Sequence, residues 1–144
     1  MLKFLFRAIL SFSVWLYQRT NGKLGGKVQG LPVLLLTTTG RKTGKKRITP
    51  LGYFEYDGHY VISASYAGLD MHPAWFHNLK NNPEVKLQIQ DKQLTAIAEP
   101  ANPTLRQKLW DTLVKLAPGY GAYEKRTDRE IPMVLLRPVS EESS

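Results

Sequence analysis

The residues with the clearest chemical character form a basic loop between two apolar segments. The loop reads Gly-Arg-Lys-Thr-Gly-Lys-Lys-Arg over residues 40–47, with five cations in the seven positions 41–47. The flanking segments, 32–39 and 48–56, have the composition of β-strands. A loop held at both ends cannot spread its charges, which favours an anionic ligand such as a phosphate or a carboxylate. The alternative is a basic hairpin whose charges are solvated.

This loop does not match a nucleotide-binding phosphate loop. Three residues separate Gly40 from Gly44, whereas a Walker loop has four and continues with Lys and Ser or Thr. The chain also contains no Gly-x-Gly-x-x-Gly fingerprint, so a Rossmann dinucleotide site is not indicated. The remaining prediction is a strand–loop–strand cradle that offers glycine amides and cations to an anion.

Charge and composition narrow the kind of ligand. The net charge is +8; residues 1–54 contain ten Lys or Arg and no Asp or Glu, and residues 55–144 contain ten basic and twelve acidic residues. An anionic membrane, nucleic acid or phosphorylated small molecule would suit the basic third. Nucleic acid is disfavoured because no helix-turn-helix, zinc-finger or RNP pattern is present. No metal site is expected, because the chain lacks cysteine and its three histidines lack metal-binding spacing.

Two further groups of side chains are suited to a ligand. Ser63 and Ser65 are two apart in a predicted strand, so their hydroxyls share one face. They either fill the end of the strand or form hydrogen bonds with a ligand. Tyr120 and Tyr123 lie in the segment Pro-Gly-Tyr-Gly-Ala-Tyr, where the rings either cover a flat ligand or pack the loop against the protein.

The elements that position these residues are expected in the order β-β-β-α-β-β-α-β. The turn Asp57-Gly58 predicts a hairpin, and Pro50 places its strand at an edge, a bulge or a strand start. Because no βαβ crossover is indicated, the order favours a closed or nearly closed antiparallel barrel with two flanking helices. The predicted strands cover residues 32–39, 47–56, 59–66, 85–89, 93–98 and 131–136, and the predicted helices cover 74–80 and 103–116. Asp70 or His72 is expected to cap the first helix before Pro73, and Asn102, followed by Pro103, is expected to cap the second.

Residues 2–17 form an apolar and aromatic segment interrupted by Lys3 and Arg7. It is shorter than the roughly 20 apolar residues that span a bilayer, and no signal-peptide cleavage site follows it. The pattern indicates an interfacial helix on an anionic membrane. The alternative is a helix that packs on the protein itself or on a partner subunit. The glycine-rich residues 21–30 are expected to be a flexible link.

A series of motifs resembles the deazaflavin-dependent nitroreductase family, split β-barrel proteins that use coenzyme F420. The likeness extends over about residues 31–138, in the order and spacing of the family. The matching segments are Leu-Leu-Leu-Thr-Thr-Thr-Gly-Arg-Lys-Thr-Gly-Lys-Lys-Arg-Ile-Thr-Pro-Leu (34–51), Val-Ile-Ser-Ala-Ser-Tyr-Ala-Gly (61–68), His-Pro-Ala-Trp-Phe-His-Asn-Leu-Lys-Asn-Asn-Pro (72–83), Pro-Gly-Tyr-Gly-Ala-Tyr (118–123) and Thr-Asp-Arg-Glu-Ile-Pro (127–132).

The resemblance implies a fold, a cofactor and a set of site residues. The fold is α+β and mainly β, a Greek-key-like antiparallel split β-barrel with flanking helices. Ser65 and Tyr123 are implied as catalytic residues, and Tyr120, Tyr123 and Arg126 as substrate residues. The implied cofactor-binding residues are Thr37, Thr38, Thr39, Arg41, Lys42, Thr43, Gly44, Lys45, Lys46, Arg47, Pro50, Ser63, Ala64, Ser65, Tyr66, Pro73, Ala74, Trp75, Phe76 and Asn78.

The implied reaction is hydride transfer from C5 of reduced F420 to a quinone, an activated alkene or a nitro compound. Flavin mononucleotide (FMN) is considered as an alternative cofactor because related split barrels also bind it, but it is less favoured than F420. Arg126 replaces an aromatic residue of the nitroimidazole-activating relatives, which weighs against that activity. Gly52 replaces a pocket tyrosine of some relatives, which would widen the cavity. The alternative function is a non-catalytic barrel that binds a cofactor or lipid at the membrane surface.

Three regions are therefore predicted: an apolar helix and linker (1–27), a split-barrel deazaflavin domain (28–139) and a disordered tail (140–144). The protein is expected in the cytoplasm, with peripheral contact to the inner face of the cell membrane through residues 1–17. A monomer or a homodimer is expected, with no nucleic-acid partner.

Overall fold

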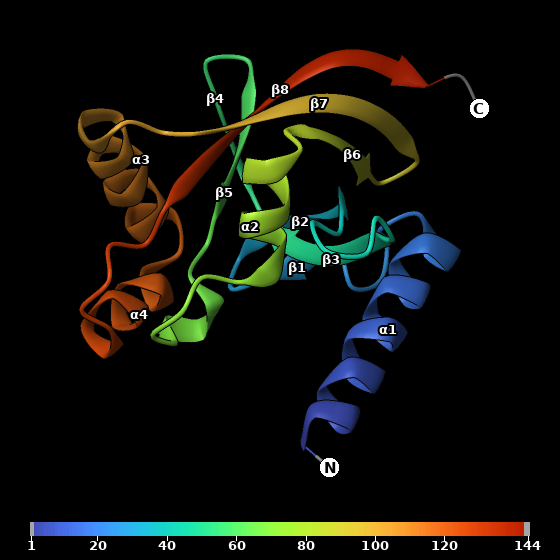
Figure 1. Ribbon diagram of the computed structural model, residues 1–144, viewed down its shortest axis with the longest axis horizontal. Helices are drawn as coiled ribbons and strands as arrows, with labels where there is room; N and C mark the ends of the chain where they lie inside the picture. The colour runs from blue at the N-terminus through green and yellow to red at the C-terminus, as the bar shows by residue number, and fades with distance from the viewer. Residues whose placement is uncertain (1, 143–144) are drawn as a thin grey trace.

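The computed structural model describes residues 2–142 of the chain and contains one curled antiparallel sheet with helices around it (Figure 1). Along the sheet the strands follow the order β1-β2-β6-β7-β8-β5-β4, and β3 pairs with β2. The strands are β1 (Lys27–Val28), β2 (Leu31–Thr39), β3 (Lys46–Gly52), β4 (Phe54–Tyr56), β5 (His59–Ser63), β6 (Glu84–Ile89), β7 (Lys92–Pro100) and β8 (Met133–Glu142). The helices are α1 (Leu2–Thr20), α2 (Ala74–Asn81), α3 (Pro103–Leu116) and α4 (Gly121–Arg126), with 3-10 turns η1 (Tyr66–Gly68) and η2 (Pro118–Tyr120).

β2 is central to the fold because it is covered on both faces. Leu34 and Leu36 face the main core beside α2, whereas Val33 and Leu35 face Tyr17 of α1. Side chains alternate between the faces of a strand, so burial on both faces accounts for the continuous apolar run predicted as a barrel strand. That prediction is confirmed, as is the antiparallel split barrel.

The predicted hairpin forms between β4 and β5. Tyr56 pairs with His59, and the two turn residues Asp57 and Gly58 have positive φ angles of 50° and 78°. Two successive left-handed residues match the twist of a two-residue hairpin. Pro50 lies within β3, which pairs with β2 alone in the described sheet, so its missing N–H is tolerated at an edge.

One of the two predicted helix caps is confirmed and the other is wrong. Asn102 caps α3 as predicted, because its Oδ1 accepts a hydrogen bond from Leu105 N at 2.9 Å. The predicted cap of α2 by Asp70 or His72 is wrong. Pro73 occupies the N-cap position and contributes no side-chain hydrogen bond, and the helix begins at Ala74.

Several elements extend the predicted order. β1 forms inside the predicted link, and the predicted strand 47–56 breaks at Tyr53, whose N–H donates to Pro32 O at 2.9 Å. Residues 118–126 form η2 and α4 instead of an irregular loop. β8 continues through Glu142 because it pairs with β7, so residues 140–142 of the predicted tail lie in a strand. Residues 143–144 lie outside the described residues.

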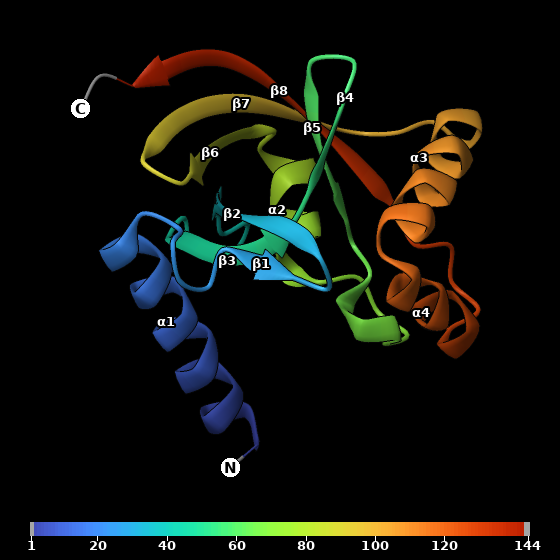
Figure 2. The ribbon, with the colours of Figure 1, turned by 180° about the vertical axis from the view of Figure 1, so that it is seen from behind.

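α1 docks through its C-terminal half while its N-terminal half extends away from the sheet (Figures 1 and 2). Tyr17 is 1% exposed; its hydroxyl donates to Val33 O at 2.9 Å and accepts from Gln90 N at 2.7 Å. α3 and α4 lie on the opposite side of the molecule. None of the helices in the described residues has the length and apolar character needed to cross a bilayer.

Candidate functional site: a groove from the basic loop to a tyrosine pair

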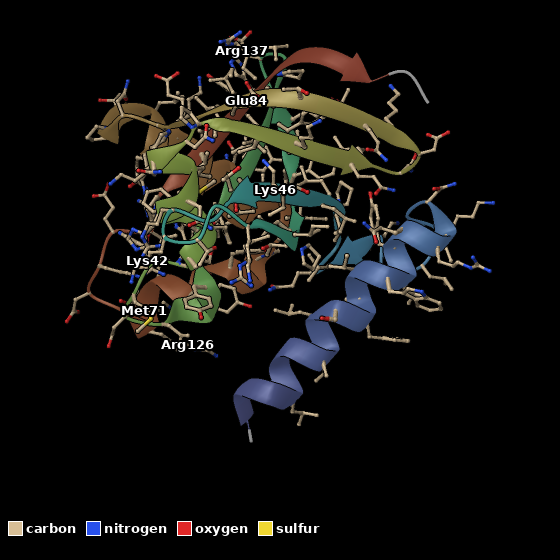
Figure 3. All side chains as sticks on the ribbon, turned by 45° about the vertical axis from the view of Figure 1, so that its right-hand side comes forward. Lys42, Lys46, Met71, Glu84, Arg126 and Arg137 are labelled. Carbon is tan, nitrogen blue, oxygen red and sulfur yellow. The ribbon has the colours of Figure 1, made fainter. Side chains whose placement is uncertain are left out.

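A groove of about 1000 Å³ lies between β3 and the C-terminal half of α1, and it extends to the basic loop and to Tyr120 and Tyr123. Figure 3 shows Lys42 on one side of the view with Met71 and Arg126, while α1 stands on the other side. The strand β3 provides one long wall, through residues 46–52. The groove therefore connects a cationic end with an aromatic end.

The basic loop has a defined backbone. Gly40 N donates to Lys45 O and Gly44 N donates to Gly40 O, each at 2.8 Å. Gly44 has φ +72°, a left-handed conformation that suits glycine. The loop is also tied to α2, because Asn78 Oδ1 accepts from Arg41 N at 3.1 Å and Asn78 Nδ2 donates to Thr38 Oγ1 at 3.3 Å. The loop cations are thus carried on an ordered turn.

The loop cations are exposed and uncompensated. Among the described residues, no carboxylate lies within ion-pair distance of any of the five. Lys46 Nζ donates to Thr39 Oγ1 at 2.8 Å, a neutral partner that leaves its charge in place. Four of the five line the groove, namely Arg41, Lys42, Lys46 and Arg47. This end of the groove can therefore hold a multiply charged anion.

The segment after β5 presents hydroxyl groups to the groove. Ser63 Oγ and Ser65 Oγ are hydrogen-bonded to each other, and Ser65 is 4% exposed. The strand predicted over residues 59–66 ends at Ser63, and Ser65 has an αR backbone at the start of η1, so the two hydroxyls meet at the end of the strand and not on a shared strand face. Tyr66 follows in a left-handed conformation with φ 47°, which is uncommon for a residue other than glycine. Both Ser65 and Tyr66 line the groove.

Arg129 holds this segment through hydrogen bonds to its backbone carbonyls. No role was predicted for Arg129 from the sequence. Its guanidinium donates to the carbonyls of Ala64, Ser65 and Leu69, at 3.1, 2.8 and 2.8 Å respectively. Its Nη1 also lies 2.9 Å from His72 Nδ1. Partial burial, and then the charge of Arg129, lower the pKa of His72, which keeps that ring neutral. A lone arginine in a loop carries no sequence signal of such contacts.

The aromatic end is built by Tyr120 and Tyr123. Their rings pack edge to face with centroids 5.4 Å apart, and burial raises the pKa of Tyr120. Gln29 reaches across from the β1–β2 turn, and its Nε2 donates to Tyr123 OH at 2.8 Å. A Cβ atom on Gly52 would lie 2.9 Å from Val28 Cγ1 and 3.2 Å from Tyr120 OH. The space at Gly52 is thus filled, so the expected wider cavity is not present there.

α1 forms the other long wall. Sequence reasoning expected a membrane helix or a helix packed on the protein or a partner subunit, and assigned no groove residue to it. The residues that line the groove include Ser11, Val14, Trp15 and Gln18, together with Leu10. The first four recur at i, i+3, i+4 and i+7, the spacing of one helix face. That pattern is the signal that could have indicated a wall-forming face.

Comparisons with known protein sequences assign the chain to a family. The model of the family described as F420H(2)-dependent quinone reductase matches residues 10–138. The chain is 39% identical over 125 residues to F420H(2)-dependent quinone reductase Rv1261c of Mycobacterium tuberculosis, covering 84% of each chain. The chain belongs to the F420H2-dependent quinone reductase family. Its members are F420-dependent reductases, so this protein is an enzyme of that kind and coenzyme F420 is its cofactor.

Solved structures of relatives have the same fold. A structure described as an F420-H2 dependent reductase (FDR-A) is 40% identical, covers 74% of this chain and 94% of its own, and has a TM-score of 0.67. Another, described as a domain-swapped dimer, is 36% identical, covers 87% of this chain and 98% of its own, and has a TM-score of 0.69. The split barrel of this chain is thus shared with an F420-H2 dependent reductase of known structure.

Most of the predicted F420-site residues converge on the groove. Those that line it are Arg41, Lys42, Thr43, Lys46, Arg47, Pro50, Ser63, Ser65, Tyr66, Pro73, Ala74, Trp75, Asn78, Tyr120 and Tyr123. The others lie outside its lining, namely Thr37, Thr38, Thr39, Gly44, Lys45, Ala64, Phe76 and Arg126.

The residues outside the lining have other contacts. Thr38 and Thr39 accept hydrogen bonds from Asn78 and Lys46, so they hold groove residues in place. Phe76 is buried in the core, as is Ala64. Arg126 covers the Tyr123 ring, with its guanidinium carbon 5.6 Å from the ring centroid. Arg126 therefore contacts a residue of the groove lining without being part of the lining, and its role towards a substrate stays a prediction.

The groove suits F420 in charge and in size. The phosphate and glutamate groups of F420 need a row of cations, and the loop offers four along the groove without competing carboxylates in the described residues. A volume of about 1000 Å³ lies at the upper end of the range for small-molecule sites, as a tricyclic cofactor together with its acceptor requires.

Proposed function

We propose that the protein binds the F420 tail on the basic loop and reduces a quinone at the tyrosine end of the same groove. The observation that carries this proposal is the continuity of the groove from uncompensated cations to an aromatic pocket. Family membership identifies the cofactor, and the residues that line the groove support the orientation proposed for it. When bound, reduced F420 supplies a hydride from C5.

The cofactor would extend from the loop towards β5 and α2. Arg41, Lys42, Lys46 and Arg47 would pair with the phosphate and the glutamate carboxylates. Ser63 to Tyr66 and Pro73 to Asn78 would hold the deazaflavin ring and its side chain, with Trp75 packed near the ring. The protein's role is to orient the ring and to exclude water from it.

Tyr123 is the better-placed proton donor of the two predicted catalytic residues. Gln29 Nε2 is a donor, so Tyr123 OH is the acceptor in that hydrogen bond and its own hydrogen remains available for an acceptor oxygen. Ser65 shares its hydroxyl with Ser63 and would instead orient the ring. Quinone reduction then balances: the quinone gains one hydride and one proton and becomes a quinol, while reduced F420 loses that hydride and one proton and becomes oxidised F420. The proton for the quinol would come from Tyr123, which would be reprotonated from water.

Activated alkenes and nitro compounds remain within the proposed acceptor range. Each accepts a hydride and a proton, so the same donor arrangement serves them. Arg126 stacks on Tyr123 and does not itself line the groove, so its side chain does not occupy the acceptor end.

An anaerobic assay of F420H2 oxidation tests the function. We expect turnover with a soluble naphthoquinone and slower turnover with cyclohexenone and a nitroimidazole, and a loss of activity in the Tyr123→Phe variant. Reduced FMN should not replace F420H2. Absence of quinone-dependent oxidation by wild-type protein that binds F420 would overturn the proposed acceptor.

We also propose that α1 contacts the inner face of the cell membrane while the barrel lies in the cytoplasm. Leu5, Ile9, Phe12 and Trp15 are 55–59% exposed, and their spacing places Leu5, Ile9 and Phe12 on one helix face. This face lies opposite the one that lines the groove. An apolar face of this kind, on the basic third of the chain, suits an anionic bilayer and a lipid-soluble quinone.

Sedimentation with anionic liposomes tests the membrane contact. We expect wild-type protein to sediment and the triple variant Leu5→Asn, Ile9→Asn, Phe12→Asn to remain in solution with its naphthoquinone activity intact. Leu116→Asn with Val139→Asn removes similarly exposed apolar side chains and should change nothing. Wild-type protein that stays in solution would contradict the proposal. A dimer that the triple variant dissociates would assign this face to a second copy, as the domain-swapped relative suggests.

A further inference from the structure

Arg129 forms a set of contacts that the proposed chemistry does not yet use. Its side chain makes four hydrogen-bond contacts with one segment: three with backbone carbonyls and one with His72 Nδ1. No carboxylate lies within ion-pair distance of it in the part of the chain that the structure describes. Burial lowers the pKa of Arg129. The charge of Asp70 opposes this shift from beyond ion-pair distance, so the groups that hold the guanidinium directly are neutral, chiefly the three backbone carbonyls.

The segment that Arg129 contacts is irregular and needs external support. It contains the three-residue turn η1, and its Tyr66 adopts a left-handed conformation that is unfavourable for a residue with a side chain. The N-terminal side of η1 has no side-chain cap. Ser65 and Tyr66, in the middle of the segment, line the groove. The position of these two residues therefore depends on what holds the carbonyls behind them.

An arginine is required for this set of contacts. The planar guanidinium presents five donors in fixed directions, and here they reach carbonyls at positions 64, 65 and 69 and a ring nitrogen at 72. A lysine has the same charge but a single point of donation, so it cannot bridge residues that lie along the length of the segment.

The same contacts connect the Ser65–Tyr66 wall of the groove with its aromatic end. Arg129 follows α4, which carries Tyr123. η1 and α4 are packed closely, because a Cβ atom on Gly68 would lie 2.9 Å from Arg126 Cβ and 3.1 Å from Tyr123 O. Arg129 thus ties the wall that holds Ser65 to the segment that holds Tyr123.

We propose that Arg129 is a positioning residue that sets the spacing between the Ser65–Tyr66 wall and Tyr123, and so controls the hydride-transfer step and not the binding of F420. The inference rests on the proposed function of the groove. The F420 tail is held by the loop, which Arg129 does not contact, so binding and turnover respond differently to its loss. A displacement of about 1 Å between reacting groups can cost up to 100-fold in rate.

The test compares Arg129→Lys, Arg129→Gln and Arg129→Ala with wild type, and uses Arg137→Lys on β8 as a matched control. We expect kcat with a naphthoquinone to fall about 10- to 100-fold in all three Arg129 variants, while the Kd of F420 changes less than about 3-fold. Methylguanidinium should restore part of the activity of Arg129→Ala and none of that of Arg129→Gln. Hydrogen exchange at the amides of residues 64–72 should accelerate in the variants.

Three results would overturn the inference: an unchanged kcat, a loss of F420 binding equal to the loss of kcat, or a loss of kcat that matches the unfolded fraction in thermal melts. Hydrogen exchange does not depend on turnover. If wild-type protein fails to reduce quinones, the proposed acceptor fails, and the exchange rates of residues 64–72 still decide whether Arg129 positions the wall.

Discussion

The two ends of the groove are built in different ways. The cationic end comes from one continuous stretch, β2–loop–β3, in which Gly40 and Gly44 close the turn and Asn78 ties it to α2. The aromatic end is assembled from segments distant in sequence: Gln29 and Tyr123, which are joined by a hydrogen bond, are 94 positions apart. The proposed site for the charged tail of the cofactor is therefore encoded locally, while the proposed acceptor pocket depends on the whole fold.

Charge reversal on the loop should have the largest effect and should affect only the cofactor end. In Lys42→Glu with Lys46→Glu, we expect the Kd of F420 to rise about 100-fold, about 2.7 kcal/mol, because two attractions become repulsions beside a polyanion. The folded structure should persist, since both side chains are exposed. Fluorescence titration measures the change.

The matched control is Lys92→Glu with Arg137→Glu. Both residues are exposed and outside the groove lining, and Figure 3 draws Arg137 far from Lys42. It changes the net charge equally, so an equal loss of affinity in this variant would assign the effect to overall charge and not to the loop.

Removing the side chain that ties the loop to α2 should be the next largest effect. Asn78→Ala leaves Thr38 Oγ1 and Arg41 N without their partner at a site where Asn78 is 4% exposed. We expect a loss of about 2 kcal/mol in the free energy of unfolding. Urea denaturation measures it, and an unchanged midpoint would show that the tie does not hold the loop.

Substitutions at the aromatic end of the groove should lower kcat and leave the Kd of F420 unchanged. Gln29→Leu removes the donor to Tyr123 OH, and we expect kcat for a naphthoquinone to fall about 10-fold, with Tyr123→Phe falling at least as far. Because both act through one hydroxyl, the double variant should be no slower than Tyr123→Phe alone. Strictly additive losses would mean that the two residues work independently.

The smallest expected effect is a dependence of stability on pH. Burial, with Arg129, His77 and Lys80 nearby, lowers the pKa of His72 below its ordinary value of 6.5, and burial with Arg41 and Lys80 lowers that of His77. Below pH 6.5 the unfolded chain then binds more protons than the folded one. The free energy of unfolding should be at its full value above pH 6.5 and fall as the pH drops towards the folded pKa values.

Thermal melts between pH 8 and pH 5 measure this dependence, at values spread about the ordinary pKa of histidine. His72→Gln keeps an acceptor for Arg129 Nη1 but does not titrate, so its melts should fall less with acid than those of wild type. An identical pH dependence in wild type and His72→Gln would exclude His72 as a source.

Features that depend on neighbouring residues could be predicted from the sequence, and features that depend on distant residues could not. The basic loop, the Asp57-Gly58 hairpin and the Asn102 cap depend on neighbouring residues, and each forms as predicted. The roles of α1, Gln29 and Arg129 depend on partners between 16 and 94 positions away. No local pattern specifies such contacts, because they arise only when the sheet closes. The family resemblance implied a role for Tyr123, which stays a prediction, and it gave no indication of Gln29, whose Nε2 donates to the Tyr123 hydroxyl.

The central claim is that the loop holds the anionic tail of F420, and titration with a truncated cofactor tests it most directly. Wild-type protein would be titrated with F420, with the deazaflavin riboside that lacks the phosphate and the glutamates, and with FMN. We predict that the riboside binds at least about 100-fold more weakly than F420, and that the Lys42→Glu, Lys46→Glu variant reduces this difference to less than about 10-fold. Equal binding of F420 and the riboside by wild-type protein would contradict the account.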